Sequence, residues 1–291
     1  MLVRWPEVSI KTNAYAVVNG LGKHALFTNL IEDLSKKDDN KISIISLNPE
    51  LFQYHPKVQN SIPMSWLKEK PWLKDYISKI YFTEPYSNDY NFEDQHIINN
   101  WREHLGLETT ELTTCDIYTD EKSKQYTQDV LKSVDKPFIF LQLKGGTHVS
   151  QDQPRPHFDE RGMLDEDIDE LIHALIKEFG KKYMFFILRT KLDYYSEKTI
   201  QHPGVATIED EYTLAIIETI KQCKAFVGID SCLQHFASNR HKIKKGVVLW
   251  GQSTKPTMIG HDHNINIRSE KVSSVYVNPK AIIEGLKELN V

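Results

Sequence analysis

The sequence contains little cysteine and no long apolar run. Its 291 residues include three cysteines, and Cys115, Cys223 and Cys232 lack the spacing of a metal or redox motif. We therefore expect neither disulfides nor a cysteine zinc site. No stretch approaches the roughly 20 consecutive apolar residues of a membrane-spanning helix, and the first dozen residues mix charged side chains with short apolar pieces, unlike a signal peptide. A cytoplasmic protein is predicted.

An excess of positive charge is also absent. The chain has 36 lysines and arginines against 40 aspartates and glutamates, a formal net charge of -4. Because the lysines are scattered, we do not expect a broad nucleic-acid-binding face, and any anionic ligand must be held by a focused site. Hydrophobic residues form 40% of the chain and charged residues 26%, as in soluble globular proteins, and the length favours about two domains.

Short apolar strands alternate with amphipathic helices along the whole chain, a pattern typical of parallel sheets in α/β proteins. The polar break Asp135-Lys136-Pro137 resists helix continuation and predicts a boundary between domains at 1–134 and 135–291. The pattern predicts strands at 14–18, 42–47, 79–82, 115–118, 138–143, 184–188, 205–208, 225–229 and 246–250, and helices at 23–35, 92–104, 121–133, 163–179, 194–200, 212–223, 232–240 and 279–289. We therefore expect two doubly wound, Rossmann-like units whose ligands bind beyond the carboxyl ends of the strands.

The most informative segment follows the apolar run that ends at Ile229. Asp230 and Ser231 stop that strand and precede a helix, whose first backbone N-H groups suit a phosphate or diphosphate. We expect Ser231, Cys232 and Leu233 to contribute these N-H groups, and the Asp230 carboxylate to take sugar or ribose hydroxyls. His235 lies one turn further on, and its two alternative roles are a structural hydrogen bond and a direct ligand contact.

The same residues resemble a family signature. Asp230 to Ala237 reads Asp-Ser-Cys-Leu-Gln-His-Phe-Ala and is similar to the Asp-Ser/Thr-Gly-x-x-His pattern of the heptosyltransferase-like glycosyltransferases (glycosyltransferase family 9), with Cys232 in place of the glycine. Gly246 to Thr254 resembles the next strand and turn of that family, and Asn19 to Leu30 its first strand-to-helix loop.

This resemblance implies the GT-B fold, in which two Rossmann-like domains face a cleft and a last helix, here 279–289, returns to the first domain. The implied activity is that of a metal-independent, inverting glycosyltransferase, which moves a sugar from a nucleotide-diphosphate-sugar donor to a hydroxyl acceptor such as a glycan or a lipid-linked group. No further cofactor is implied. The sugar, the nucleobase, the acceptor and the oligomeric state are left open.

The resemblance places the loop that contains Gly20 and Gly22 on the acceptor side. This loop lacks the third glycine of a dinucleotide fingerprint. The resemblance implies an acidic base at the position of Lys23, and a lysine can accept a proton at neutral pH only where desolvation lowers its pKa. We therefore predict that His24, with an ordinary pKa of about 6.5, is the base, although it can also pack against the first helix. Other candidates in this half are Glu93, Asp94 and His96.

Three loops of the second half are predicted to complete the donor site. Lys144, Gly145 and Thr147 follow strand 138–143 and can wrap a phosphate, although a plain glycine turn is an alternative. The resemblance implies a basic residue before the long helix, for which we select Arg155 or Lys144. It also implies contacts to the nucleotide from the loops after 188 and 208, for which the candidates are Arg189, Asp193 and Glu211.

Other readings remain open. His261-Asp262-His263 lacks a third ligand at a recognisable spacing, so no metal site is predicted. A GT-B nucleotide-sugar epimerase and a catalytically silent nucleotide-sugar-binding protein share the predicted fold. A Rossmann enzyme that uses NAD is disfavoured, because neither half has the full glycine fingerprint.

Overall fold

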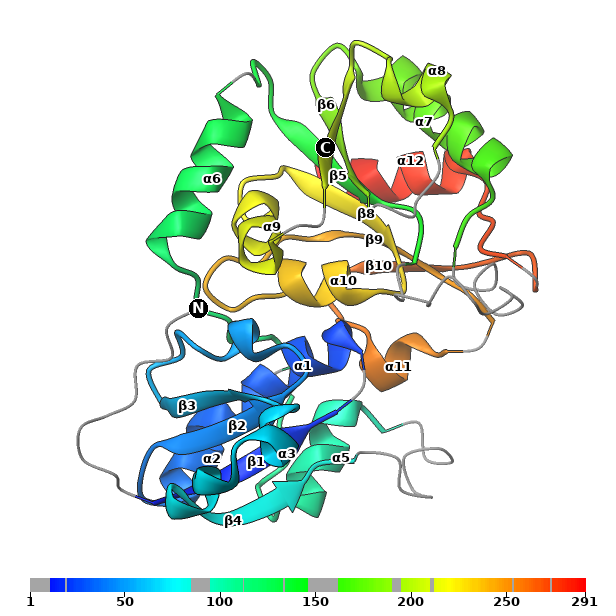
Figure 1. Cartoon of the computed structure of the whole chain (residues 1–291). Coiled ribbons are helices and arrows are strands. Elements are labelled where there is room, and N and C mark those ends of the chain that lie inside the picture. The colour runs from blue at the N-terminus through cyan, green and yellow to red at the C-terminus, as the bar shows by residue number, and fades with distance from the viewer. Residues whose placement is uncertain are drawn as a thin grey trace. The chain divides into compact units, whose positions relative to one another are not determined.

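The computed structural model describes residues 11–18, 20–84, 95–111, 113–132, 134–145, 162–189, 195–209, 212–252, 254–272 and 274–291. The chain divides into two compact units (Figure 1). Unit 1 contains Met1–Asp120, Asn239–His241 and Thr257–Ile259, and unit 2 contains Glu121–Ser238, Lys242–Pro256 and Gly260–Val291. Within the described ranges, no helix combines the length and the apolar character that crossing a membrane requires.

Unit 1 is built on a parallel sheet with the strand order β3-β2-β1-β4. Its strands are β1 (Thr12–Val17), β2 (Ile42–Ser46), β3 (Val58–Pro63) and β4 (Ile77–Phe82), and its helices are α1 (Leu21–Phe27), η1 (Thr28–Leu30), α2 (Ile31–Lys37), η2 (Pro49–Leu51), α3 (Trp66–Glu69), η3 (Pro71–Asp75) and α5 (Ile97–His104). The predicted helix 23–35 is therefore three short segments. The predicted strand 115–118 is reduced to one bridge, between Cys115 and Asn239.

Unit 2 is built on a six-stranded parallel sheet with the order β10-β9-β8-β5-β6-β7. The strands are β5 (Phe138–Gln142), β6 (Met184–Arg189), β7 (Val205–Glu209), β8 (Ala225–Ile229), β9 (Gly246–Trp250) and β10 (Ile265–Arg268). Counted within the unit, this is the Rossmann order. The strand order reverses between the neighbours β5 and β8, which is where such sheets bind ligands.

Alternating side chains of this sheet are covered by helices. Ile139, Leu141, Val227 and Ile229 form one core with residues of α7 and α12. The helices after Asp120 in the chain are α6 (Glu121–Leu131), α7 (Asp165–Phe179), α8 (Glu197–Ile200), α9 (Thr213–Ile220), α10 (Cys232–Ala237), α11 (Pro256–Ile259) and α12 (Pro279–Glu288). Of these, α11 lies mostly in unit 1, which contains Thr257–Ile259. The alternating inward side chains of the strands and the apolar stripes of α7 and α12 meet in that core.

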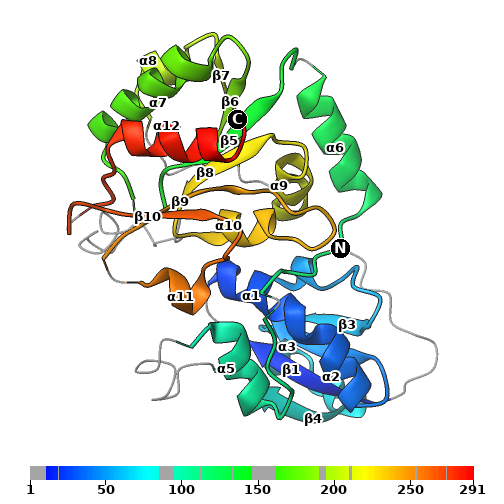
Figure 2. The same ribbon diagram turned by 180° about the vertical axis from the view of Figure 1, so that it is seen from behind.

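Helices α6 and α12 correct two expectations about the domains. Helix α6 lies in unit 2, where Thr127 Oγ1 donates a hydrogen bond to the carbonyl oxygen of Ala215 (3.1 Å), so the break follows Asp120 rather than residue 134. Helix α12, predicted to return to the first domain, instead packs in unit 2 beside α7, β9 and β10 (Figure 2). Gly285 permits this approach, because a Cβ there would lie 3.1 Å from Val247.

Candidate functional site

The candidate site lies at the strand reversal of unit 2. Strands β5 and β8 are paired there, with Gln142 opposite Gly228. Strand β8 ends at Ile229 and α10 begins at Cys232, so the predicted strand, turn and helix are all present. The segment beyond β8, Asp230 and Ser231, and the segment beyond β5, which includes Lys144 and Gly145, therefore leave the sheet from neighbouring strands.

Two buried glutamines hold the Asp230-Ser231 turn. Ser231 is the N-cap residue of α10 in an extended conformation, but its hydroxyl makes no cap hydrogen bond. It donates instead to Gln142 Oε1 at 2.6 Å. The Gln234 Nε2 amide donates to Asp230 Oδ1 at 3.1 Å. Neither glutamine was predicted, because in the sequence Gln142 ends an apolar strand and Gln234 lies within an apolar helix.

Cys232 does not need the flexibility of the family glycine. The non-glycine residues with positive φ in the described ranges are Asp39 and Asn290, so the backbone of Cys232 has an ordinary conformation. Cys232 and Ser231 are partly exposed, whereas Leu233 is buried. A side chain at position 232 is therefore compatible with the predicted backbone contacts.

Lys144 follows strand β5, the neighbour of β8, and has partners of its own. Its ammonium group forms an ion pair with Asp165, the first residue of α7, and lies 5.4 Å from the centroid of the Tyr195 ring. Arg189 ends β6, the other neighbour of β5, and its Nε is buried without a hydrogen-bond partner among the described residues. The structure thus brings two basic side chains to the carboxyl edge of the sheet. The predicted contacts Thr147, Arg155, Asp193 and Glu211 lie outside the described residues.

The structure favours a structural role for His235. Its Nδ1 lies 3.0 Å from His261 Nε2, and both rings are buried. The His261 ring stacks on that of His263, whose Nε2 lies 2.9 Å from Ser238 Oγ. In the described part of the chain, no three or more His, Cys, Asp or Glu side chains are arranged to hold a metal ion.

The predicted base, His24, is enclosed in unit 1. The ring is fully buried, its Nδ1 lies 3.0 Å from the Gly20 carbonyl oxygen, and its Nε2 lies 3.1 Å from that of Val17. Asn48 Nδ2 lies 3.4 Å from Nδ1. Because both ring nitrogens face protein groups, neither is accessible to an acceptor hydroxyl in this conformation. The structure therefore shows the packed arrangement that the sequence left as the alternative.

The other predicted residues of unit 1 are more accessible or serve as caps. Gly20 is the exposed N-cap residue of α1, and Gly22 and Lys23 are partly exposed in its first turn. His96 caps α5 by accepting a hydrogen bond from the N-H of Ile98 at 3.3 Å. Glu93 and Asp94 lie outside the described residues.

The burial of His24 predicts a pH dependence of stability. Burial lowers the pKa of His24 from its ordinary value of 6.5, and that of His263 in the same direction. Below its ordinary pKa, His24 therefore binds a proton more readily in the unfolded chain than in the folded chain. The free energy of unfolding has its maximal contribution from this effect above about pH 7.5 and decreases as the pH falls below about 6.5. His24 contributes at most about 1.4 kcal/mol for each pH unit of this fall.

Urea unfolding at pH 7.5, 6.5 and 5.5 measures this effect. The His24→Gln variant keeps a polar side chain that does not titrate, and we expect a flatter pH profile for it than for the wild type. Burial raises the pKa of Asp33, but its hydrogen bonds to Arg102 and Lys36 lower the pKa by more, so the net shift is below 3.8 and Asp33 does not titrate in this range. Identical pH profiles for the wild type and His24→Gln would contradict the assignment of this pH dependence to His24.

A buried ion-pair cluster in unit 1 was not predicted. The Asp116 carboxylate is about 2% exposed and lies 2.9 Å from His55 Nε2 and 2.7 Å from Arg240 Nη2. His241 Nε2 lies 2.9 Å from Asp116 Oδ1 without hydrogen-bond geometry, so that contact is electrostatic. Thr28 Oγ1 accepts a hydrogen bond from the Asp116 backbone N-H at 2.8 Å. The cluster joins the segment 239–241 to the rest of unit 1.

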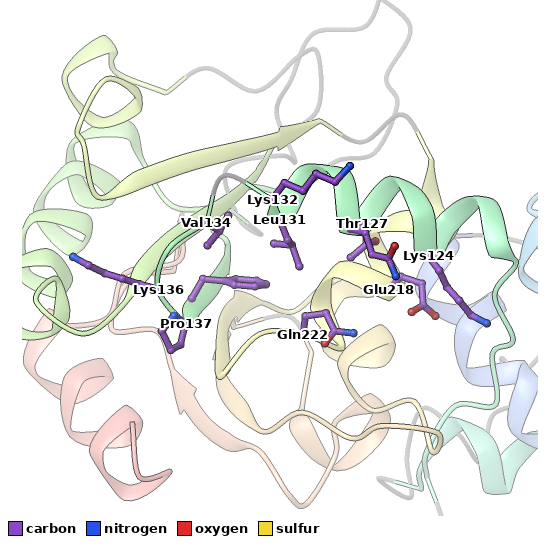
Figure 3. A pocket seen from close by; sticks show the side chains of 11 residues that line it. Lys124, Thr127, Leu131, Lys132, Val134, Lys136, Pro137, Glu218 and Gln222 are labelled. Atoms are coloured by element: carbon purple, nitrogen blue, oxygen red, sulfur yellow. The ribbon is translucent and has the colours of Figure 1, made fainter.

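A cavity of about 590 Å³ in unit 2 is separate from the candidate site. Figure 3 shows it between α6, α9 and the segment before β5. It reaches Phe138, the first residue of β5, and so lies at the opposite end of that strand from Gln142. Its charged residues have partners nearby, such as Glu218 with Lys221 at 2.6 Å and Lys124 with Glu121 at 2.6 Å. The cavity is therefore not assigned to the donor.

Comparison with solved structures relates this architecture to known proteins. The glycosyl transferase family 9 protein from Veillonella parvula superposes with a TM-score of 0.69 at 14% sequence identity, over 98% of this chain and 99% of that chain. The chain has the fold of a family 9 glycosyltransferase. E. coli ADP-heptose LPS heptosyltransferase II gives a TM-score of 0.65 at 13% identity, over 96% of this chain and 98% of that chain.

A third similar structure is the iron-containing dodecameric glycosyltransferase TibC from E. coli, with a TM-score of 0.62, 12% identity and coverage of 97% of this chain and 80% of that chain. The sequence matches no family model and no curated protein. These likenesses confirm the predicted resemblance at the level of the fold, an α/β GT-B fold with two parallel sheets. The predicted cleft between the units stays a prediction.

Proposed function

We propose that the protein is an inverting glycosyltransferase that moves a sugar from a nucleotide-diphosphate-sugar donor to a hydroxyl acceptor. The observation that carries this proposal is the position of Asp230 and Ser231 at the strand reversal of unit 2. Sheets of this kind bind ligands there, and the fold is that of structures described as glycosyltransferases. One of those structures, TibC, is described in complex with ADP-D-β-D-heptose.

The residues around this turn suit a nucleotide-diphosphate sugar. In the proposal the Asp230 carboxylate accepts hydrogen bonds from sugar hydroxyls, and the backbone N-H groups of Ser231, Cys232 and Leu233 bind the diphosphate. Lys144 and Arg189 supply positive charge at the same edge, and neutralising the leaving diphosphate in this way stabilises the transition state without requiring a metal ion. Arg155 and Thr147 are proposed to add contacts from the loop after β5.

The acceptor is activated from the first half of the chain in this proposal. Removal of a proton from its hydroxyl needs a base, and Lys23 stands where the resembling family has an acid. Because His24 is enclosed, the proposal does not assign the base to it and does not depend on the identity of the base.

A thermal-shift panel tests the donor site. We expect one class among ADP-, GDP-, UDP-, dTDP- and CMP-sugars to raise the unfolding midpoint, because a ligand specific for the folded state stabilises it. At a ligand concentration 100 times Kd the stabilisation is about 2.7 kcal/mol. Midpoints unchanged by every nucleotide and sugar nucleotide in the panel would contradict the proposal. Conversion of the sugar nucleotide without an acceptor would instead identify an epimerase.

A further inference from the structure

The buried side-chain amide of Gln234 is hydrogen-bonded through its nitrogen only. It is the third residue of α10, and its side chain is entirely buried. The Nε2 donates to Asp230 Oδ1 at 3.1 Å, whereas the Oε1 is buried and has no hydrogen-bond partner in the described part of the chain. The amide orientation is fixed by this arrangement, because turning it over would set the oxygen against the Asp230 carboxylate.

Such a residue is unfavourable for stability. A buried acceptor without a partner destabilises the folded state, and such groups are rare in native proteins. The neighbouring Leu233 and Phe236 are buried and apolar, so an apolar side chain at position 234 would fill the same space without an unpaired oxygen. What the glutamine adds over methionine is the hydrogen bond to Asp230.

We propose that Gln234 is a positioning residue that fixes the Asp230 carboxylate against the sugar of the bound donor, an inference that rests on the proposed function. The hydrogen bond restrains the rotation of a side chain that is partly exposed at the carboxyl edge of the sheet. An amide is uncharged, so it orients the carboxylate without neutralising it. The negative charge then stays available to sugar hydroxyls, which a lysine or arginine at this position would prevent.

The variant Gln234→Met tests this role, with ADP-heptose and free ADP as paired probes in isothermal titration calorimetry. We expect ADP-heptose to bind about 3- to 10-fold more weakly, the range for a lost hydrogen bond. ADP lacks the transferred heptose that the proposal places against Asp230, so its affinity should stay within about twofold. The thermal midpoint should stay unchanged or rise, because the unpaired buried oxygen is removed. If the thermal-shift panel identifies a donor with another nucleobase, that sugar nucleotide and its nucleoside diphosphate replace ADP-heptose and ADP as probes.

A double-mutant cycle shows whether Gln234 acts through Asp230. In the Asp230→Ala background, Gln234→Met should cause no further loss of ADP-heptose affinity. Thr219→Val, which removes a buried side-chain hydrogen bond in α9, is the matched control and should lower the midpoint without changing the ratio of the two affinities.

The outcomes separate this inference from the proposed function. Equal losses for ADP and ADP-heptose in Gln234→Met, or a lower midpoint with unchanged affinities, would overturn the positioning role alone. Additive losses in the double variant would do the same. Failure of the wild type to bind any sugar nucleotide would overturn the proposed function and this inference together.

Discussion

Replacing Asp116 by alanine is expected to lower the free energy of unfolding by about 2–4 kcal/mol. The change removes a buried carboxylate that accepts a hydrogen bond from His55, forms an ion pair with Arg240 and attracts His241. Most of the lost stability comes from His55, because its side chain is 1% exposed and water cannot replace the lost acceptor. Arg240 and His241 are 39% and 35% exposed and can be hydrated, which keeps the loss below that of a fully buried ion pair.

Urea unfolding with linear extrapolation measures the effect. The matched control is Asp129→Ala, which removes a carboxylate from the exposed ion pair with Lys132 on α6. Pairs of this kind add little to stability, so no measurable change is expected in the control. An Asp116→Ala variant as stable as the control would show that the cluster does not hold segment 239–241 in unit 1.

The fold was predictable where the strands are continuous apolar runs. Strand β8 and its neighbours are buried on both faces, and their sequences are accordingly continuous apolar runs. Strands β3 and β10 were missed because they lie at sheet edges and contain polar residues, as in Val58–Pro63, where buried and partly exposed positions alternate. The segment 115–118 has the composition of a strand, but its single bridge partner, Asn239, is more than 100 residues away in the chain.

The candidate site was predictable only where its residues are adjacent in the sequence. Asp230 and Ser231 follow an apolar strand directly, and the rule for parallel sheets places them at the binding edge. Gln142 is 89 residues from Ser231, and a contact over that distance depends on the strand order. The enclosure of His24 was not predicted, because it depends on carbonyl oxygens and on Asn48, which no local sequence pattern reveals.

Asp230 is expected to have the largest effect on donor binding. Hydrogen bonds to a charged group contribute about 1.5–3 kcal/mol, so Asp230→Ala should weaken ADP-heptose binding by about 10- to 150-fold. Alanine also leaves the buried Gln234 Nε2 without its acceptor, so this variant should lose some stability as well. The loss of affinity in Asp230→Ala therefore mixes two causes.

The variant Asp230→Asn separates them. Its Oδ1 keeps the acceptor for Gln234 and the shape of the turn, whereas the negative charge is gone. We expect the thermal midpoint to return to that of the wild type while ADP-heptose affinity, measured by calorimetry, stays at least about fivefold reduced, since a neutral acceptor is roughly half as strong as a carboxylate. Wild-type affinity in both variants would remove Asp230 from the donor site, whereas recovery in Asp230→Asn alone would assign it the structural role of holding Gln234 and α10.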